Sequence, residues 1–159
     1  MVNEKSYGVV TPDILKSHSG LDFLQSIIAG KTPNPPISEL LNFHLAEAEK
    51  GRVVFNGTPE WRFYNPIGSV HGGWAATLLD SALGCAIFTM LEKGDGWTTV
   101  ELKINYVRGL DQDSGPMRAE GRLIHRGRTI ATSEGDLKDS AGKLYAHATT
   151  TCMIFPAKS

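Results

Sequence analysis

The sequence predicts an α+β domain in which a curved antiparallel sheet wraps one long helix. Its 159 residues are 41% hydrophobic and 21% charged, as in one ordinary soluble globular domain. One segment, Trp74 to Met90, is apolar nearly throughout and follows a pair of glycines. Strand-like segments flank it on both sides. A helix that is apolar nearly all round must be covered on most sides, and a strongly curved sheet supplies that cover.

Residues 1–36 are predicted to form an N-terminal helical extension with a proline-rich connector. Thr11-Pro12-Asp13 is a typical helix start, with a Thr cap and a proline in the first turn. The apolar positions that follow indicate one kinked helix or two short helices, broken near Ser19-Gly20, with Gly30 as the C-cap. Thr32 to Pro36 is predicted to be extended, because successive prolines disfavour a helix.

Residues 37–159 are predicted to form the main domain. Ile37 to Glu60 is interpreted as two strands joined by a turn at Lys50-Gly51. The long helix is predicted over residues 72–92, because a basic residue and two glycines follow it at 93–96.

Four more strands are predicted after the helix. From Thr99 to Tyr106 polar and apolar residues alternate, which is typical of a half-buried strand. Residues 117–125 and 128–138 indicate a hairpin, and a turn at 139–142 leads into a last strand that ends near Phe155. The sequence has no internal repeat.

Charge and cysteine usage exclude several classes of protein. Sixteen basic residues against seventeen acidic ones argue against nucleic-acid binding. Trp74 to Met90 is short for a membrane span, and Asp80 at its centre would cost about 2.5–3.5 kcal/mol on insertion. Cys85 and Cys152 lack metal-site or redox spacing and are expected to be reduced and buried. We therefore predict a cytoplasmic protein without a metal, a nucleic-acid partner or a membrane anchor.

A helical wheel divides the long helix into two faces. One face should contact the sheet and comprises Ala75, Leu78, Leu79, Ala82, Ala86 and Thr89. The opposite stripe is small and polar and comprises Gly73, Thr77, Asp80, Ser81 and Gly84. Burying an unpaired charge is costly, so Asp80 is either a structural acid with a hydroxyl or basic partner on a strand, or a functional acid. From the residues alone both interpretations stay open.

The start of the helix supplies the second element of a candidate site. Its first N–H groups lack internal partners, and Gly72 has no side chain to block access, so its N–H is suited to binding an oxyanion. Asp80 is suited to act as a nucleophile or a general base. At 1.5 Å per residue the two lie about 12 Å apart along the helix. If both act on one carbonyl, they act from different subunits across a two-fold axis.

Several motifs resemble those of hot-dog acyl-CoA thioesterases of the phenylacetate-pathway (PaaI-like) type. The resemblance covers roughly residues 37 to 155. It rests on Asn65-x-x-Gly68-x-x-His71-Gly72-Gly73 with Leu78 and Asp80, on the run Thr99 to Tyr106, and on Gly127-Arg128-Thr129.

The resemblance implies a hot-dog fold and hydrolysis of an acyl-CoA, aromatic or of short or medium chain, to a free acid and CoA. By position, Asp80 would be the catalytic carboxylate, and Gly72 of the partner subunit would polarise the thioester carbonyl. Asn65 would hold the carbonyl or the attacking water, and Thr99 would orient the water at Asp80. CoA enters as part of the substrate, so no cofactor is expected. A homodimer is the minimum assembly, and a homotetramer, a dimer of dimers, is expected.

Further residues are candidates for binding the substrate. His71 and Gly73 lie at the helix start, where a structural role for His71 is favoured over that of a base. Arg126, Arg128 and Thr129 could bind the phosphates of CoA, since arginine matches phosphate oxygens, or could form a solvated hairpin. Both interpretations stay open.

Three other functions compete with hydrolysis. A hot-dog hydratase or dehydratase needs a His–acid pair, and the dehydratase motif with prolines after its histidine is absent. A non-catalytic acyl-CoA-binding module would not need Asp80, Asn65 and Gly72 together. A DNA-binding acyl-CoA sensor would need a basic recognition helix, and the first forty residues are too short and not basic enough.

Overall fold

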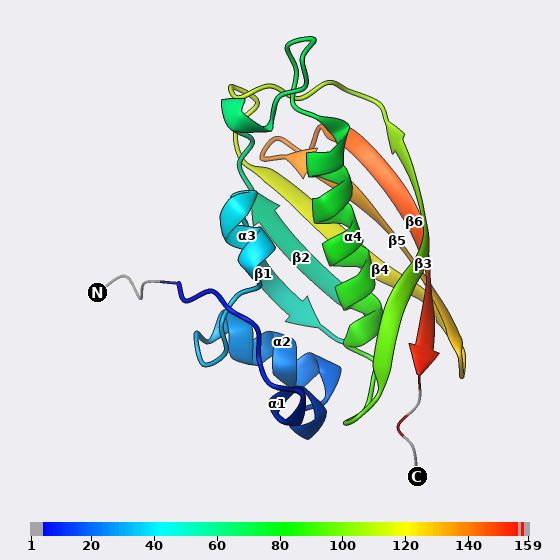
Figure 1. Cartoon of the computed structure of the whole chain (residues 1–159). Coiled ribbons are helices and arrows are strands. Elements are labelled where there is room, and N and C mark those ends of the chain that lie inside the picture. The colour runs from blue at the N-terminus through cyan, green and yellow to red at the C-terminus, as the bar shows by residue number, and fades with distance from the viewer. Residues whose placement is uncertain (1–4, 156, 158–159) are drawn as a thin grey trace.

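The computed structural model describes residues 5–155 and residue 157. Six antiparallel strands form one curved sheet in the order β1-β2-β4-β5-β6-β3, and the helix α4 lies in its hollow (Figure 1). The strands are β1 (Phe43–Glu49), β2 (Arg52–Gly57), β3 (Gly96–Tyr106), β4 (Met117–Arg126), β5 (Ile130–Asp139) and β6 (Leu144–Phe155). The helices are α1 (Pro12–Ser17), α2 (Gly20–Ile28), α3 (Pro36–Leu40) and α4 (Gly72–Phe88), with a 3₁₀ turn at Trp61–Phe63. The predicted α+β hot-dog fold is confirmed.

The helix α4 packs on the sheet with the predicted face. All six residues assigned to that face are buried: Ala75, Leu78, Leu79, Ala82, Ala86 and Thr89. Two strand glycines allow this close approach, because a Cβ at Gly121 would overlap the Ala82 carbonyl oxygen, and one at Gly135 would lie 2.6 Å from a methyl carbon of Leu83. The Ser133 hydroxyl donates to the Leu83 carbonyl at 2.9 Å. Residue 80 is thereby held in a fixed position over the sheet.

Two predicted boundaries are wrong. The helix α4 ends at Phe88 and not near residue 92, because the Thr89 hydroxyl donates to the Ala86 carbonyl and accepts from the Gly51 N–H, tying this end to the β1–β2 turn. Residues 36–40 form the short helix α3 instead of a connector and strand, since Pro36 occupies the first helical turn, where a missing N–H costs nothing. Among residues 5–155, no helix is long and apolar enough to cross a membrane.

The strand β3 contains a bulge that changes which side chains face α4. Its pairing with β6 shifts between Thr99 and Glu101, so Val100 has no partner residue. Before the bulge Trp97 and Thr99 pair with buried residues of β6, and after it Leu102 does so. In a regular strand, Thr99 and the exposed Glu101 would point to the same face of the sheet. The bulge instead turns Thr99 toward α4, as bulges beside functional sites often do.

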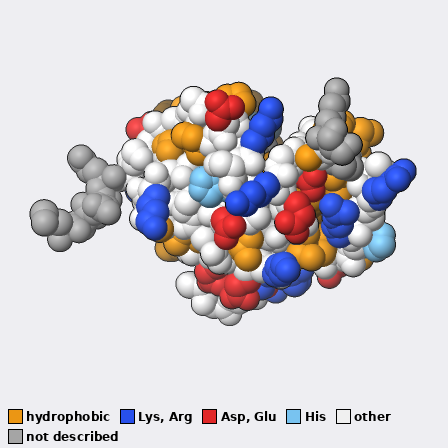
Figure 2. Space-filling view, turned by 90° about the horizontal axis from the view of Figure 1, so that it is seen from below, with side chains coloured by type: hydrophobic (Ala, Val, Ile, Leu, Met, Phe, Trp, Pro, Cys, Tyr) orange, Lys and Arg blue, Asp and Glu red, His pale blue; other side chains and the backbone are white. Residues whose placement is uncertain are grey.

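The N-terminal helices cover the C-terminal end of α4 (Figure 1). The predicted break is confirmed: α1 ends at Ser17, and Ser19 caps α2 by accepting from the Asp22 N–H at 3.3 Å. Gly30 adopts φ 70° directly after the Ala29 C-cap, as predicted for a helix end. Seen from this end, basic and acidic side chains are mixed with small hydrophobic groups (Figure 2), so no single-sign patch covers this face.

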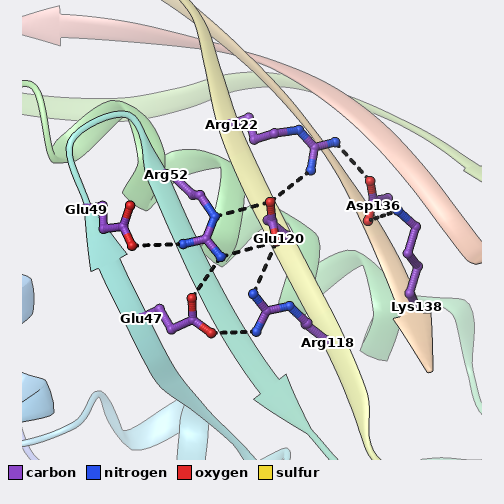
Figure 3. A network of polar contacts seen from close by, with 8 residues as sticks. All are labelled: Glu47, Glu49, Arg52, Arg118, Glu120, Arg122, Asp136 and Lys138. Atoms are coloured by element: carbon purple, nitrogen blue, oxygen red, sulfur yellow. Dashed lines mark hydrogen bonds and ion pairs between the residues drawn. The ribbon is translucent and has the colours of Figure 1, made fainter. Parts of the chain in front are cut away.

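The outer face of the sheet carries an ion-pair network (Figure 3). The Glu47 carboxylate lies 2.8 Å from Arg52 and 2.7 Å from Arg118. Both arginines also contact Glu120, and the network continues through Arg122, Asp136, Lys138 and Glu49. Val54, paired with Glu47 and Glu120 in neighbouring strands, is fully buried beneath it. These acids are therefore held in ion pairs on the outer face.

Candidate active site

Asp80 projects from the middle of α4 and is half-buried. The Thr99 hydroxyl on β3 donates to its Oδ1 atom at 3.0 Å. None of the salt bridges among the described residues includes Asp80, so no Lys, Arg or His nitrogen of these residues lies within 4.0 Å of its oxygens. The carboxylate thus has a neutral partner on one oxygen, and its Oδ2 is available to a water molecule or a substrate.

Two thiols lie close to this carboxylate. Burial raises the pKa of Cys85 to about 12, and the nearby Asp80 charge acts in the same direction. Burial also raises the pKa of Cys152, whose sulfur lies 3.8 Å from the Thr99 hydroxyl. Both cysteines are free, as expected, and both stay protonated near neutral pH. Neither thiol is therefore suited to be a nucleophile at this pH.

The N-terminal end of α4 borders a separate cavity of about 380 Å³, lined in part by Asn65, Gly72, Tyr106 and Arg108. Gly72 is the first helical residue, and among residues 5–155 no acceptor is found for its N–H. Its carbonyl accepts from the Tyr106 hydroxyl at 3.1 Å. A free N–H at a helix start facing a cavity is suited to binding an oxyanion.

Asn65 holds its own loop together. Its Oδ1 accepts from the N–H groups of Ile67 and Ser69 at 3.1 and 3.3 Å, and its Nδ2 donates to the Ser69 hydroxyl at 2.9 Å. An amide group carries two N–H donors, so one remains for a ligand. The motif residue therefore has a structural function that the sequence did not indicate.

His71 caps the helix, as the favoured structural role requires. Its Nδ1 accepts from the Gly73 N–H at 2.9 Å, which makes this nitrogen a hydrogen-bond acceptor and occupies its lone pair. A Cβ at Gly73 would lie 2.9 Å from the same nitrogen, so a side chain there would displace the cap. Both residues shape the helix start that presents the Gly72 N–H.

The candidate residues fall into three groups that one chain does not bring together. Asn65, His71 and Gly72 lie at the start of α4, and Asp80 with Thr99 lies about 12 Å along the helix. The β4–β5 hairpin lies near the other end of α4, where Arg126 is 3.7 Å from Asp95 in the turn after the helix. Arg128 and Thr129 are exposed on that hairpin.

Two aromatic residues at the site were not identified from the sequence as site residues. Tyr106 contacts Gly72, and Trp97 lies near both Gly84 and Thr99. Alternation indicates that Tyr106 lies on the apolar side of its strand, but not which turn of α4 it reaches. That contact depends on the register of β3, which no local pattern in the sequence encodes.

Comparison with known proteins identifies the family of this chain. The family profile of the thioesterase superfamily matches residues 67–146, about half of the chain. Human acyl-coenzyme A thioesterase 13 is 31% identical over 110 residues, covering 67% of this chain and 76% of the relative.

Two solved structures are similar in fold and sequence. A phenylacetic acid degradation-related protein of Ralstonia eutropha JMP134 superimposes with a TM-score of 0.74 at 28% identity, covering 82% of this chain and 98% of the other. A Streptococcus mutans UA159 protein bound to acetyl CoA gives 0.65 at 26% identity, covering 74% and 92%. With its hot-dog fold and this family match, the chain belongs to the thioesterase superfamily and is a thioester hydrolase.

Proposed function

We propose that the protein hydrolyses acyl-CoA thioesters to a carboxylic acid and free CoA. The observation that carries the proposal is the Asp80 carboxylate, which has a neutral hydroxyl partner and no cation within 4.0 Å among the described residues. The human relative is named for acyl-CoA hydrolysis, and the Streptococcus mutans structure contains acetyl CoA. These similarities favour the same substrate class for this chain.

In the proposed mechanism, Asp80 acts on the thioester carbonyl directly or through water. As a general base, it takes a proton from water while the water oxygen bonds to the carbonyl carbon. The carbonyl oxygen becomes an oxyanion that accepts a hydrogen bond from the N–H of Gly72 of the partner subunit. Collapse of this intermediate breaks the carbon–sulfur bond, and the CoA thiolate receives the proton from Asp80. If Asp80 attacks directly, its oxygen bonds to the carbonyl carbon, the carbon–sulfur bond breaks and CoA leaves as a thiolate. Water then hydrolyses the resulting anhydride, which restores the Asp80 carboxylate, yields the carboxylic acid and supplies the proton that the thiolate takes up.

Thr99 and Asn65 assist in positioning. Thr99 donates to Oδ1 of Asp80, which fixes the carboxylate with Oδ2 toward the substrate. Asn65 has one N–H donor beyond its contact with Ser69, suited to the carbonyl oxygen or the attacking water.

Gly72 and Asp80 of one chain are too far apart for one carbonyl, so the proposal requires a homodimer. The strand β3 lies at the edge of the sheet and offers unpaired backbone groups to a second copy. Pairing two β3 edges about a two-fold axis would give two sites, each with Asp80 from one chain and Gly72 from the other. A dimer of two such dimers is the expected larger assembly.

The phosphates of CoA are assigned to the exposed hairpin residues Arg128 and Thr129, because arginine matches phosphate oxygens. Arg126 already pairs with Asp95 and contributes charge at the same place. This chemistry requires no cofactor, because CoA is part of the substrate. We place the reaction in the cytoplasm, where Cys85 and Cys152 would stay reduced.

The activity is tested on a panel of acetyl-, octanoyl- and phenylacetyl-CoA, with a thiol reagent detecting released CoA. We expect turnover with at least one substrate, and loss of turnover in Asp80→Ala with the assembly intact by light scattering. Asp136→Ala, an acid in the outer-face network, is the control and should retain turnover. Release of CoA by Asp80→Ala at the wild-type rate would contradict the assignment.

The shared site is tested by mixing two inactive proteins. Asp80→Ala lacks the carboxylate, and Gly72→Pro lacks the N–H donor while keeping a residue suited to a first helical turn. Heterodimers of the two contain one site with both groups intact, so mixing should restore up to about half the wild-type activity per heterodimer. Demonstrated heterodimers without activity would exclude catalysis across the interface.

A further inference from the structure

An apolar cavity of about 320 Å³ lies between the N-terminal helices and the C-terminal half of α4. Leu15 of α1 and Phe23 and Leu24 of α2 line one side of it. Cys85, Phe88 and Trp97 line the other side. Almost no polar group faces this space, so its occupant must be apolar.

The wall formed by α2 is firmly attached to α4. The Gly20 N–H donates to the Leu91 carbonyl at 3.0 Å. A Cβ on Gly20 would overlap the Phe88 carbonyl oxygen, so only glycine allows this approach. The Phe23 ring meets the Phe88 ring edge-on at 6.0 Å, and Leu24 is 3% exposed. The cavity is therefore a built feature of the fold and not a gap beside a loose segment.

The cavity lies beside the candidate catalytic site, and the Trp97 side chain, which lines the cavity, lies between the two. Its indole stacks on Phe88 with 3.9 Å between ring centres. On α4, a Cβ at Gly84 would lie 3.6 Å from the indole nitrogen and 3.9 Å from the hydroxyl of Thr99, the partner of Asp80. Cys85 on the cavity wall is five residues, about 7.5 Å along the axis, beyond Asp80. An acyl group whose carbonyl lies at Asp80 would therefore enter this space by passing the Trp97 side chain.

We infer that this cavity holds the acyl group of the substrate and that the N-terminal helices form its far wall. The inference rests on the proposed function and names its substrate class. At about 30 Å³ for each water-sized atom, the volume accepts roughly ten heavy atoms. That size fits a medium-chain or arylacetyl group and leaves an acetyl group largely without contacts. The extension therefore sets which acyl chains are hydrolysed.

The first test changes the far wall without touching Asp80. Leu15 is 38% exposed and borders the cavity, whereas its neighbour Ile14 is 43% exposed and does not. Leu15→Trp should fill part of the cavity, and Ile14→Trp is the matched control for a bulky residue on α1. Each buried methylene group of the acyl chain raises affinity about fourfold. If Leu15→Trp removes the room for two or more methylene groups, the ratio of kcat/KM for octanoyl-CoA to that for acetyl-CoA should fall at least about tenfold. The control should keep the wild-type ratio.

A second variant, which enlarges the cavity, shows whether the effect of Leu15→Trp comes from a folding defect. Leu15→Ala should move the preferred chain length upward by one or two carbons, and its thermal unfolding should stay cooperative. A ratio that is unchanged in Leu15→Trp, with octanoyl-CoA still hydrolysed, would overturn the inference and leave the thioesterase function intact.

A binding measurement separates the inference from the proposed function. Calorimetry compares CoA with its S-octyl thioether, which cannot be hydrolysed. If the cavity holds the chain, the thioether binds at least about tenfold more tightly than CoA to the wild type and to Ile14→Trp, and Leu15→Trp loses most of this gain. Equal affinity for CoA and the thioether would overturn the inference whether or not the wild type hydrolyses any thioester.

Discussion

Two acidic side chains of this molecule are held in opposite ways. Glu47, on the outer face of the sheet, receives hydrogen bonds from Arg118 and Arg52, and these lower its pKa from 4.5 to about 2. Asp80, on the helix inside the sheet, receives one hydrogen bond from the neutral Thr99 hydroxyl. One carboxylate is neutralised by two cations and the other by none among the described residues.

The difference is the one expected between a structural acid and a functional one. An ion pair occupies the oxygens of Glu47 and fixes its charge, so little remains for chemistry. The single hydroxyl on Asp80 orients the group and leaves an oxygen available. The sequence alone gave equal weight to a structural and a functional Asp80, and the missing basic partner now favours the functional interpretation.

The largest expected contrast is in turnover. Asp80→Asn keeps the size of the side chain and removes its basicity, so kcat should fall about 10²- to 10⁴-fold. Glu47→Gln is the matched change in the structural acid and should leave kcat within about twofold. Steady-state kinetics on the best acyl-CoA of the panel measures both. A large loss in Glu47→Gln with a folded protein would remove the distinction between the two acids.

A smaller effect is expected from the partner of Asp80. Thr99→Val keeps the shape and removes a hydrogen bond to a carboxylate, so kcat should fall about tenfold with KM nearly unchanged. Thr99→Ser should restore most of the rate, because it returns the hydroxyl. The adjacent exposed residue serves as control, and Thr98→Val should behave as wild type. A rise in KM as large as the fall in kcat would indicate that Thr99 contributes to substrate binding and not to positioning Asp80.

Stability should show the reverse contrast. Glu47→Gln weakens two partly exposed ion pairs and should lower the free energy of unfolding by about 1 kcal/mol. Asp80→Asn removes a charge that has no cationic partner and should leave that free energy unchanged or slightly higher. Urea unfolding measures both, with Glu134→Gln as an exposed acid that makes no ion pair among the described residues. A clear loss in Asp80→Asn would return Asp80 to the structural class.

The smallest expected effect is on stability at low pH. Because hydrogen bonds from Arg118 and Arg52 lower the pKa of Glu47 to about 2, its contribution to stability is complete above the unfolded value of 4.5. It is lost as pH falls from about 4.5 through about 2. The difference in melting temperature between wild type and Glu47→Gln should therefore be constant above about pH 5, become small by pH 2 and vanish at lower pH. A constant difference down to pH 2 would show that the ion pair does not hold this charge.

Local patterns in the sequence predicted much of the fold. Apolar spacing identified the buried face of α4, and glycines and polar clusters marked most of the turns. The errors have local causes that periodicity does not resolve. Pro36 begins a helix although prolines usually break one, and Thr89 ends α4 through a bond to the distant Gly51.

For the site, the sequence by itself determined the motif residues and, through the helix rise, the separation of Gly72 from Asp80. Helix geometry is fixed by neighbours in the chain, so this distance needs no knowledge of the fold. The tertiary structure alone decided that the bulge in β3 turns Thr99 toward Asp80 and that the extension encloses a cavity beside Trp97. These contacts join residues far apart in the chain, and strand register and packing, which place them, have no local signature.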